Sequence, residues 1–277
     1  MAAETLIKTE LDGGVFTITL NRPESMNAMN QAMGNRIRDA VRHAARDPEV
    51  RVVVVTGAGR AFCAGGDIKN LGKPDEEDTL AVRYGSDPRW NDTEMRVERL
   101  NETTMTYYQL QSMPKPTIAM VNGAAIGAGM APALACDFRI CSDRAVFNTG
   151  YANIALSGDI GTSYFLTCVV GTAKARELMF FPKTVSAQQA LSMGLVTKVV
   201  PHDSLLEETM AMARELAAGP ILAFGHMKEN LSAAMEQDPR VAFDIESRNF
   251  VRCFQTQDHK EAVNAFKEKR KPVFTGN

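Results

Sequence analysis

Hydrophobic residues in the first 200 positions follow two spacings, one typical of strands and one typical of helices. Apolar and small polar side chains alternate over residues 15–23 and stop at Pro23, which predicts a strand. Residues 50–59 are rich in β-branched side chains and end in glycines, which predicts a strand buried on both faces. Apolar residues at helical spacing predict a helix over 29–47, and a second helix is predicted over 93–112, ended by the prolines at 114 and 116. Further elements predicted are strands over 117–123 and 138–143 and a helix of small residues over 125–137.

The recurring order of strand, loop and helix predicts an α/β fold with right-handed crossovers. Residues 70–93 are polar and predict a mobile surface segment. After Pro201 only amphipathic helices are predicted, with no strand between them. We therefore divide the chain into a core, residues 1–205, and a C-terminal helical subdomain, residues 206–277.

Composition and charge exclude several classes of protein. The 277 residues are 45% hydrophobic and 23% charged, as in ordinary globular proteins. A formal net charge of −2 provides no general attraction for nucleic acid or for an anionic membrane. The N-terminus lacks the pattern of a signal peptide, and no apolar run approaches the ~20 residues of a membrane span. We expect a cytoplasmic protein without nucleic-acid or membrane partners.

Cysteine and histidine positions indicate no metal centre. The five cysteines are odd in number and lack metal-like or CxxC spacing, so we expect reduced, mostly buried thiols. No His, Cys, Asp and Glu cluster has metal-ligand spacing. For the four histidines we expect exposed or structural roles: His43, His202, His226 and His259.

Two glycine-rich turns between a strand and a helix are candidates for chemistry, CAGGD (63–67) and NGAAIGAGMA (122–131). Neither matches the glycine patterns that bind dinucleotides or nucleoside triphosphates. Such turns leave backbone N–H groups facing outward, and two of them converging on one oxygen form an oxyanion hole. Glycines also serve tight packing alone, and the two turns by themselves favour neither explanation.

Four segments together resemble the crotonase (enoyl-CoA hydratase/isomerase) superfamily, in the order in which that family has them. They are LNRPESMNAMN, VVVVTGAGRAFCAGGDIKNL, PKPTIAMVNGAAIGAGMAPALACDFRICSDRAVF and VSAQQALSMGLVTKVVP. The resemblance implies a spiral of ββα units and a C-terminal α-helical trimerisation subdomain, with trimers often paired into hexamers. It also implies an acyl-CoA thioester substrate, with coenzyme A arriving as part of the substrate and no permanently bound cofactor.

Matched position by position, the resemblance assigns the two oxyanion donors to the backbone N–H groups of Gly66 and Ala128. Phe266 and Lys269 in the last helix are weak candidates for further contacts with coenzyme A. The remaining matched substrate-binding positions, several of which act through main-chain groups, are Met26, Ala28, Ala64, Asp67, Ile68, Gly127 and Tyr151.

The chain departs from the hydratase pattern at both catalytic glutamates. Ala131 stands at the first glutamate position and Tyr151 at the second. Neither side chain is a carboxylate acid or base, so we do not expect water addition by the two-glutamate route. For Tyr151 we consider both a pocket wall, which we favour, and a hydroxyl that orients the substrate.

One carboxylate, Asp159, matches a position where isomerase branches of the family keep a catalytic acid. The DIGT run resembles dienoyl-CoA isomerases, and GAGMA without glutamate resembles the epoxyphenylacetyl-CoA isomerase branch. Outside this context an aspartate beside a glycine most often caps a helix or a turn. Because an isomerase needs one base that removes a proton and returns it elsewhere, we expect an enoyl-CoA isomerase with Asp159 as acid and base.

Three alternatives remain. In an aryl-CoA dehalogenase, Asp159 would be the nucleophile, but the helix over 93–112 lacks the histidine of that branch. In an enoyl-CoA hydratase of fatty-acid degradation, a lyase, Asp159 would handle water alone. A non-catalytic acyl-CoA binder is the alternative from another class, and the retained carboxylate argues against it.

Overall fold

The computed structural model describes residues 5–70, 82 and 85–277. Part of the predicted mobile segment, residues 70–93, therefore lies outside the described residues. Its described portion includes a short 3₁₀ helix, η3 (Pro88–Asn91), directly before helix α3 (Thr93–Ser112). Helix α3 has the bounds that the sequence predicts.

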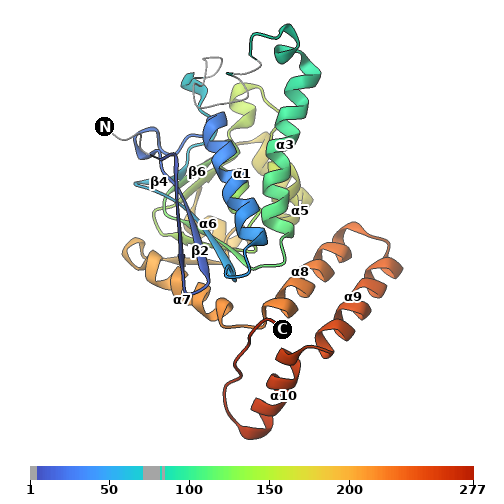
Figure 1. Ribbon diagram of the computed structural model, residues 1–277. Coiled ribbons are helices and arrows are strands. Elements are labelled where there is room, and N and C mark those ends of the chain that lie inside the picture. The colour runs from blue at the N-terminus through green and yellow to red at the C-terminus, as the bar shows by residue number, and fades with distance from the viewer. Residues whose placement is uncertain (1–4, 71–81, 83–84) are drawn as a thin grey trace.

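A six-stranded sheet forms the centre of the core (Figure 1). The first strand pairs antiparallel to the second, and all the other neighbours are parallel. In spatial order the strands are β1 (Ile7–Asp12), β2 (Val15–Leu20), β3 (Val52–Gly57), β5 (Thr117–Val121), β7 (Phe138–Ser142) and β10 (Lys198–Val200).

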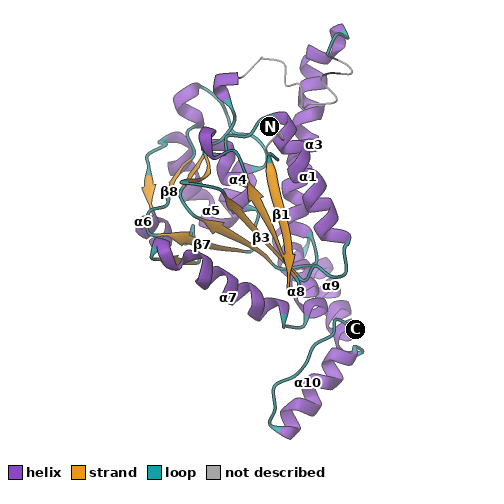
Figure 2. Ribbon diagram, turned by 60° about the vertical axis from the view of Figure 1, so that its left-hand side comes forward, coloured by secondary structure: helices purple, strands orange, loops and turns teal. Residues whose placement is uncertain are grey.

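Helices cover both faces of this sheet, which explains the hydrophobic run in β3. Val53 and Val55 belong to the hydrophobic core shared with α1 (Gln31–Arg46) and α3, whereas Val52 and Val54 belong to the one shared with α7 (Leu205–Ala217). Figure 2 shows α1 and α3 on one side of the sheet and α7 on the other. Every residue of β3 is consequently buried, as the β-branched run predicts.

A second, four-stranded sheet lies beside the first and was not predicted as a separate unit. Its strands are short, so they provide little periodicity to detect in the sequence. In spatial order they are β4 (Ala61–Cys63), β6 (Ala124–Ile126), β8 (Val146–Asn148) and β9 (Val185–Ser186), with only β9 antiparallel to its neighbour.

The helix predicted over residues 125–137 was wrong in extent. Strand β6 occupies its start, followed by the 3₁₀ turn η4 (Gly127–Met130) and the single-turn helix α4 (Ala131–Leu134). Gly127 has a φ of +53°, outside the helical range, so the chain turns sharply there before any helix can form. Helices α5 (Thr162–Phe180) and α6 (Ala187–Ser192) complete the core.

The C-terminal helices α8 (Ile221–Glu236), α9 (Pro239–Phe254) and α10 (Gln257–Glu268) form an arm that projects from the core (Figures 1 and 2). The predicted division at residue 205 stays a prediction. Helix α7 lies against the sheet, and the projecting part of the chain begins with α8.

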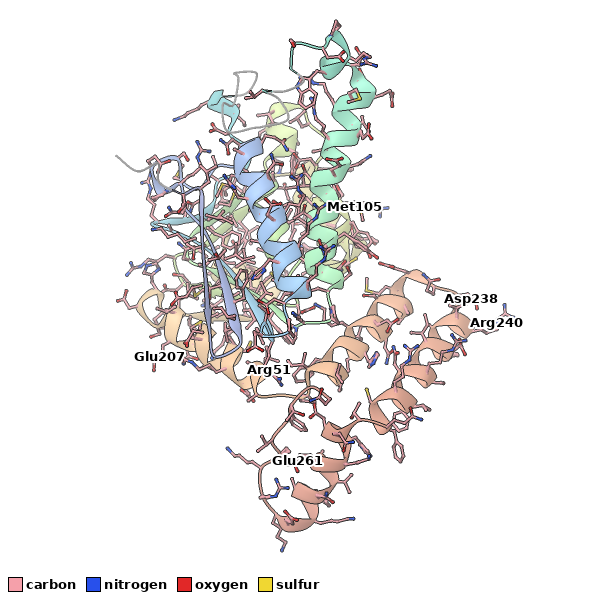
Figure 3. The ribbon with its side chains drawn as sticks, viewed as in Figure 1. Arg51, Met105, Glu207, Asp238, Arg240 and Glu261 are labelled. Carbon is pink, nitrogen blue, oxygen red and sulfur yellow. The ribbon has the colours of Figure 1, made fainter. Side chains whose placement is uncertain are left out.

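Arg51 joins the core to the base of this arm (Figure 3). Its guanidinium donates hydrogen bonds to the carbonyl oxygens of Ala217 and Gly219, at the end of α7, and of Phe274 in the C-terminal tail. One side chain thus connects the start of β3, the α7–α8 turn and the tail.

Candidate active site

Three parallel strands of the small sheet end beside one another, and each is followed by predicted site residues. Gly66 follows β4, Gly127 and Ala128 follow β6, and Tyr151 follows β8. The carboxyl ends of parallel strands are where open α/β sheets bind their ligands. The fold therefore brings together residues that are up to 85 positions apart in the sequence.

The glycine-rich turn after β4, CAGGD (63–67), is the first turn, and it directs the N–H of Gly66 away from the segment at Met29 with which it pairs. Gly66 forms an isolated parallel bridge with Met29. Met29 makes both hydrogen bonds of that bridge, donating to the Gly65 oxygen at 2.7 Å and accepting from the Asp67 N–H at 2.9 Å. In this pairing the polar groups of Gly66 itself point to the opposite side, and Gly66 is exposed.

The second turn presents the N–H of Ala128 in a similar way. Ala128 is the second residue of η4, and the first N–H groups of a helix have no acceptor within it. The residue as a whole is buried, with 7% of its surface exposed, and it belongs to the hydrophobic core. An alanine at this position keeps the donor that the resemblance requires.

Glycines without room for a side chain hold the two turns in contact. A Cβ on Gly65 would lie 2.8 Å from the Ile126 oxygen and 3.8 Å from the Ala128 nitrogen, and Gly65 has a φ of +100°. A Cβ on Gly129 would lie 2.2 Å from the Cys63 oxygen. The two candidate oxyanion donors are therefore on backbone segments that touch each other.

The third strand end extends the site to Tyr151. A Cβ on Gly127 would lie 3.5 Å from the Thr149 oxygen, so the second turn adjoins the residues that follow β8. Gly150, with a φ of +68°, then turns the chain into the 3₁₀ turn η5 (Tyr151–Ile154). Tyr151 is buried, with 4% of its surface exposed.

Asp159 lies in a tight turn just before α5 and is partly buried. Gly158, Ile160 and Gly161 all have positive φ values, of 110°, 42° and 83°. Ile160 is β-branched, so this conformation is strained there and must be held by its surroundings. The Thr162 N–H donates to the Asp159 carbonyl oxygen at 2.9 Å and closes the turn.

The Tyr151 hydroxyl connects this turn to the end of β8. It donates to Oδ1 of Asp159 at 2.7 Å and lies 3.0 Å from Oγ1 of Thr162. Burial raises the pKa of Tyr151, and the charge of Asp159 raises it further. Tyr151 therefore keeps its proton at physiological pH and is a hydrogen-bond donor, not a base.

A second buried tyrosine, Tyr107, comes from α3 to the same region. Its hydroxyl contacts the sulfur of Met29 at 3.3 Å, next to the first turn. Burial raises the pKa of Tyr107, and Cys63, Asp159 and Tyr151 raise it further by their charges. Tyr107 is thus near both the first turn and the Asp159 turn, and α3 closes the site on that side.

Arg22 holds together the two loops that were matched to coenzyme A. Its guanidinium donates to the carbonyl oxygen of Ala28 and to Oδ2 of Asp67, the latter at 3.0 Å. Asn27 hydrogen-bonds the backbone of Arg22 and donates to the oxygens of Ala58 and Ala61. The Ala64 N–H donates to the Met26 oxygen at 3.0 Å, so residues 26–29 run along residues 64–67.

The apolar side chains of Met26 and Ile68 flank these paired loops and are 37% and 61% exposed. The Asp67 carboxylate, in contrast, is paired with Arg22 and only 8% exposed. Both the carboxylate and the backbone N–H of Asp67 thus have partners within the chain, Arg22 and the Met29 oxygen.

Arg22→Lys is expected to weaken substrate binding more than catalysis. Lysine lacks the planar fork that reaches two acceptors at once, so one loop loses its anchor. We expect KM for an acyl-CoA substrate to rise about tenfold, which corresponds to about 1.4 kcal/mol, with kcat changed less than KM. Steady-state kinetics measures both. A loss of kcat at unchanged KM would contradict this role.

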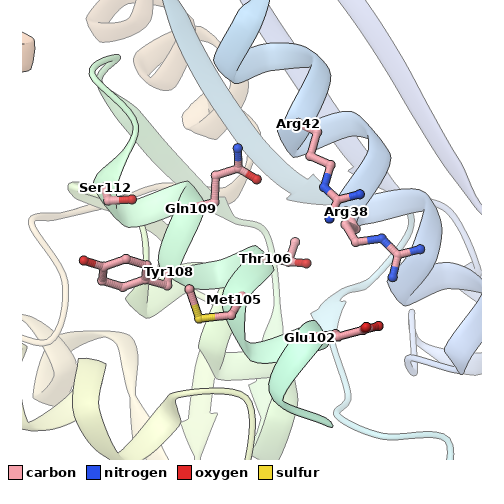
Figure 4. Close-up of a pocket in the computed structure, with 8 residues that line it drawn as sticks. All are labelled: Arg38, Arg42, Glu102, Met105, Thr106, Tyr108, Gln109 and Ser112. Atoms are coloured by element: carbon pink, nitrogen blue, oxygen red, sulfur yellow. The ribbon is translucent and has the colours of Figure 1, made fainter. Parts of the chain in front are cut away.

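Several predicted residues lie away from this cluster. Phe266 and Lys269 are at the end of α10 on the projecting arm, where Phe266 is 85% exposed, so within one chain they are remote from the core. Ala131 is fully buried at the start of α4. A shallow groove of ≈ 230 Å³ between α1 and α3, lined by Arg38, Arg42 and Met105 among others (Figure 4), includes none of the predicted site residues.

Sequence reasoning missed the supporting residues Arg22, Asn27, Tyr107 and Thr162. Arg22 and Asn27 stand in the quoted LNRPESMNAMN segment, which was a signal that they matter without indicating their partners. Thr162 stands in the quoted DIGT run. Tyr107 had no local signal, because its position in the site depends on how α3 packs.

Comparison with known proteins identifies the family to which this chain belongs. The family model described as enoyl-CoA hydratase/isomerase matches residues 10–277. The chain therefore belongs to the enoyl-CoA hydratase/isomerase family, whose members act on acyl-CoA thioesters.

Its relatives include both kinds of enzyme. The chain is 34% identical over 271 residues to the 1,2-epoxyphenylacetyl-CoA isomerase of Escherichia coli, covering 98% of each chain. It is 36% identical over 270 residues to a probable enoyl-CoA hydratase of Rhodobacter capsulatus, again covering 98% of each. A crystal structure of enoyl-CoA hydratase from Bacillus anthracis superposes with a TM-score of 0.87 at 29% identity, over 99% of this chain and all of that one. These matches confirm the predicted family and fold.

None of the helices in the described part of the chain is long and apolar enough to cross a membrane. Among the described residues, no group of three or more His, Cys, Asp and Glu side chains could hold a metal ion. All five cysteines are free thiols, and Cys63, Cys136 and Cys141 are buried.

Proposed function

We propose that the protein is an enoyl-CoA isomerase in which Asp159 is the single acid and base. The proposal rests on which carboxylates the candidate site contains. Asp159 is fixed beside Tyr151, while the two positions matched to the glutamates of hydratases are Ala131 and Tyr151. The site has one anchored carboxylate and no second one at the matched positions.

In the proposed reaction the thioester carbonyl oxygen accepts hydrogen bonds from the N–H groups of Gly66 and Ala128. These donors stabilise the negative charge that develops on that oxygen, and each contributes about 3–4 kcal/mol to the transition state. Asp159 removes a proton from one carbon of the acyl chain, which leaves an enolate with its charge on the thioester oxygen. The protonated carboxyl then returns the proton to another carbon as the double bond shifts. In an epoxide-bearing ester the enolate collapses with cleavage of the C–O bond, and the carboxyl gives its proton to the ring oxygen.

The second candidate is hydration, which the names of several relatives favour. Asp159 would then activate a water molecule without help from a second carboxylate. Dehalogenation is a weaker candidate, because α3 has no histidine.

One experiment separates these activities. A panel of enoyl-, dienoyl- and epoxide-bearing CoA esters is incubated with the enzyme in D₂O, and product mass and double-bond position are read together. An isomerase exchanges or moves protons without a net gain of water. A product heavier by one water would replace the proposal with the hydratase, and binding without exchange across the panel would indicate a non-catalytic binder.

We further propose that coenzyme A enters only as part of the substrate, through the paired loops of residues 26–29 and 64–68. Their exposed Met26 and Ile68 provide apolar surface for a planar base, and their backbone groups provide polar contacts. The free thiols fit a reducing compartment, and we keep the cytoplasm as the proposed location.

We also propose that the protein assembles as a homotrimer or a dimer of trimers through the arm. Large apolar side chains on the arm are exposed in one chain, and surfaces of this kind mark interaction sites. They include Leu231 (69% exposed), Phe243 (64%), Phe250 (70%), Phe254 (58%) and Phe266 (85%).

Phe250→Asp is expected to shift the protein to monomers, because a charge would be buried at the interface between copies. Light scattering after size-exclusion chromatography measures the mass. The control is Arg248→Gln, an exposed residue two positions from Phe250 and so on the other side of the same helix, which should keep the wild-type mass. A wild-type protein that is monomeric at micromolar concentration would contradict this assembly.

A further inference from the structure

The Tyr151 hydroxyl lies in the middle of a chain of three side chains, Thr162, Tyr151 and Asp159. The two contacts are 3.0 Å from Thr162 Oγ1 and 2.7 Å to Asp159 Oδ1. Thr162 is fully buried and Tyr151 is 4% exposed, so both hydroxyls are shielded from water. Hydrogen bonds in such surroundings are stronger than in water and polarise one another.

The direction of the chain follows from proton counting. An ionised carboxylate only accepts, so the single proton of the Tyr151 hydroxyl goes to Asp159. The Thr162 hydroxyl must therefore be the donor in the other contact, with the Tyr151 oxygen as acceptor. Each hydroxyl then has one acceptor, and Oδ1 of Asp159 accepts its hydrogen bond from an uncharged donor, the Tyr151 hydroxyl.

The backbone fixes the same three residues. Tyr151 begins η5 after β8, and Thr162 is the first residue of α5. The Thr162 N–H bonds the Asp159 carbonyl oxygen, and the positive φ values around Asp159 restrict its turn. Because the backbone of Asp159 is fixed and its Oδ1 accepts a hydrogen bond, the carboxylate cannot rotate freely. Oδ2 is the oxygen that remains for proton transfer.

We propose that Tyr151, oriented by Thr162, is a positioning residue that holds the Asp159 carboxylate in one orientation for proton transfer through Oδ2. This inference rests on the proposed function. One carboxylate oxygen takes the proton from the first carbon of the acyl chain and delivers it to the second. That oxygen must therefore be held in one orientation relative to the acyl chain. The phenol ring also fills the position matched to the second hydratase glutamate, where a water would otherwise be held.

The test compares variants by the rate of proton exchange into enoyl-CoA esters in D₂O. Tyr151→Phe removes only the hydroxyl and is expected to lower kcat about tenfold to hundredfold, the range for a hydrogen bond to a charged group. KM should change less than about twofold, because the ring is retained and only its hydroxyl is lost. Thr162→Val should lower kcat less than Tyr151→Phe, and Thr162→Ser, which keeps the hydroxyl, should restore it.

A double substitution distinguishes positioning from a general structural effect. If Tyr151 acts through Asp159, adding Tyr151→Phe to Asp159→Asn should lower the residual exchange rate no further, as measured over long incubations. The control is Tyr164→Phe on α5, whose hydroxyl bonds Glu236 instead, and which should keep wild-type kcat. Thermal unfolding verifies that each variant is folded.

The outcomes separate this inference from the proposed function. Wild-type kcat in Tyr151→Phe, or a full additional loss in the Asp159→Asn background, would overturn the positioning role while Asp159 remains the base. Wild-type exchange in Asp159→Asn would overturn both. If Tyr151→Phe does not fold, the pair Thr162→Val and Thr162→Ser decides: equal rates in the two would overturn the inference.

Discussion

Asp159→Asn is expected to lower the rate of proton exchange and of double-bond migration by ~10²–10⁴. Asparagine has nearly the same shape and still accepts the Tyr151 hydrogen bond, but its amide neither takes up nor returns a proton. The geometry of the site should therefore survive while its acid–base chemistry is lost. The measurement is deuterium incorporation at the acyl carbons, followed by mass spectrometry, for wild type and variant.

The control for this experiment is Asp203→Asn, an exposed aspartate in the 3₁₀ turn before α7. It makes the same chemical change away from the site and should leave exchange unchanged. Binding of the CoA ester should be similar in all three proteins, because Asp159 is not needed to hold the thioester. Undiminished exchange in Asp159→Asn would remove this residue from the mechanism.

Gly65→Ala is expected to lower kcat/KM by ~10²–10³, the typical cost of losing one oxyanion donor. The new Cβ would lie 2.8 Å from the Ile126 oxygen, a backbone atom that cannot move independently. In addition, the φ of +100° at Gly65 is unfavourable for alanine. Relief of this clash must separate the two turns that carry Gly66 and Ala128, so the donors no longer converge. Steady-state kinetics with an enoyl-CoA substrate measures the loss.

The matched control is Gly34→Ala, the fourth residue of α1, where no atom lies within 4 Å of the new Cβ. Alanine favours a helix over glycine by roughly 1 kcal/mol, so this variant should be at least as stable as wild type and fully active. Equal activity in Gly65→Ala and Gly34→Ala would argue against an oxyanion hole formed by these two turns.

Several elements could be predicted from the sequence because their burial patterns are local. Helix α1 and the complete burial of β3 follow from the spacing of apolar residues over windows of about ten to twenty positions. The end of α3 follows from the prolines at 114 and 116. Strand β1 was missed, because it is an edge strand with five of its six residues exposed, so it has no buried face to leave an apolar pattern.

The small sheet could not be predicted in this way, although it carries the site. Strands β4, β6 and β8 have three residues each, too few for a period to emerge. Their pairing joins segments more than 60 and about 20 residues apart, so it depends on the crossovers that bring them together. The sequence pattern instead favoured a helix over 125–137, and the turn at Gly127 prevented it.

For the site, the sequence by itself determined which chemical groups are present. It contains two glycine-rich turns, no carboxylate at positions 131 and 151, and one aspartate at position 159. The family followed from the same motifs and is confirmed by comparison. Only the tertiary structure decided how these groups meet: that Tyr151 donates to Asp159, that Thr162 supports Tyr151, and that Arg22 joins the two loops. The physical reason is the distance along the chain over which each kind of information extends. Periodicity records which side of one element is buried, whereas a hydrogen bond between separate elements forms only when packing places both partners within about 3 Å.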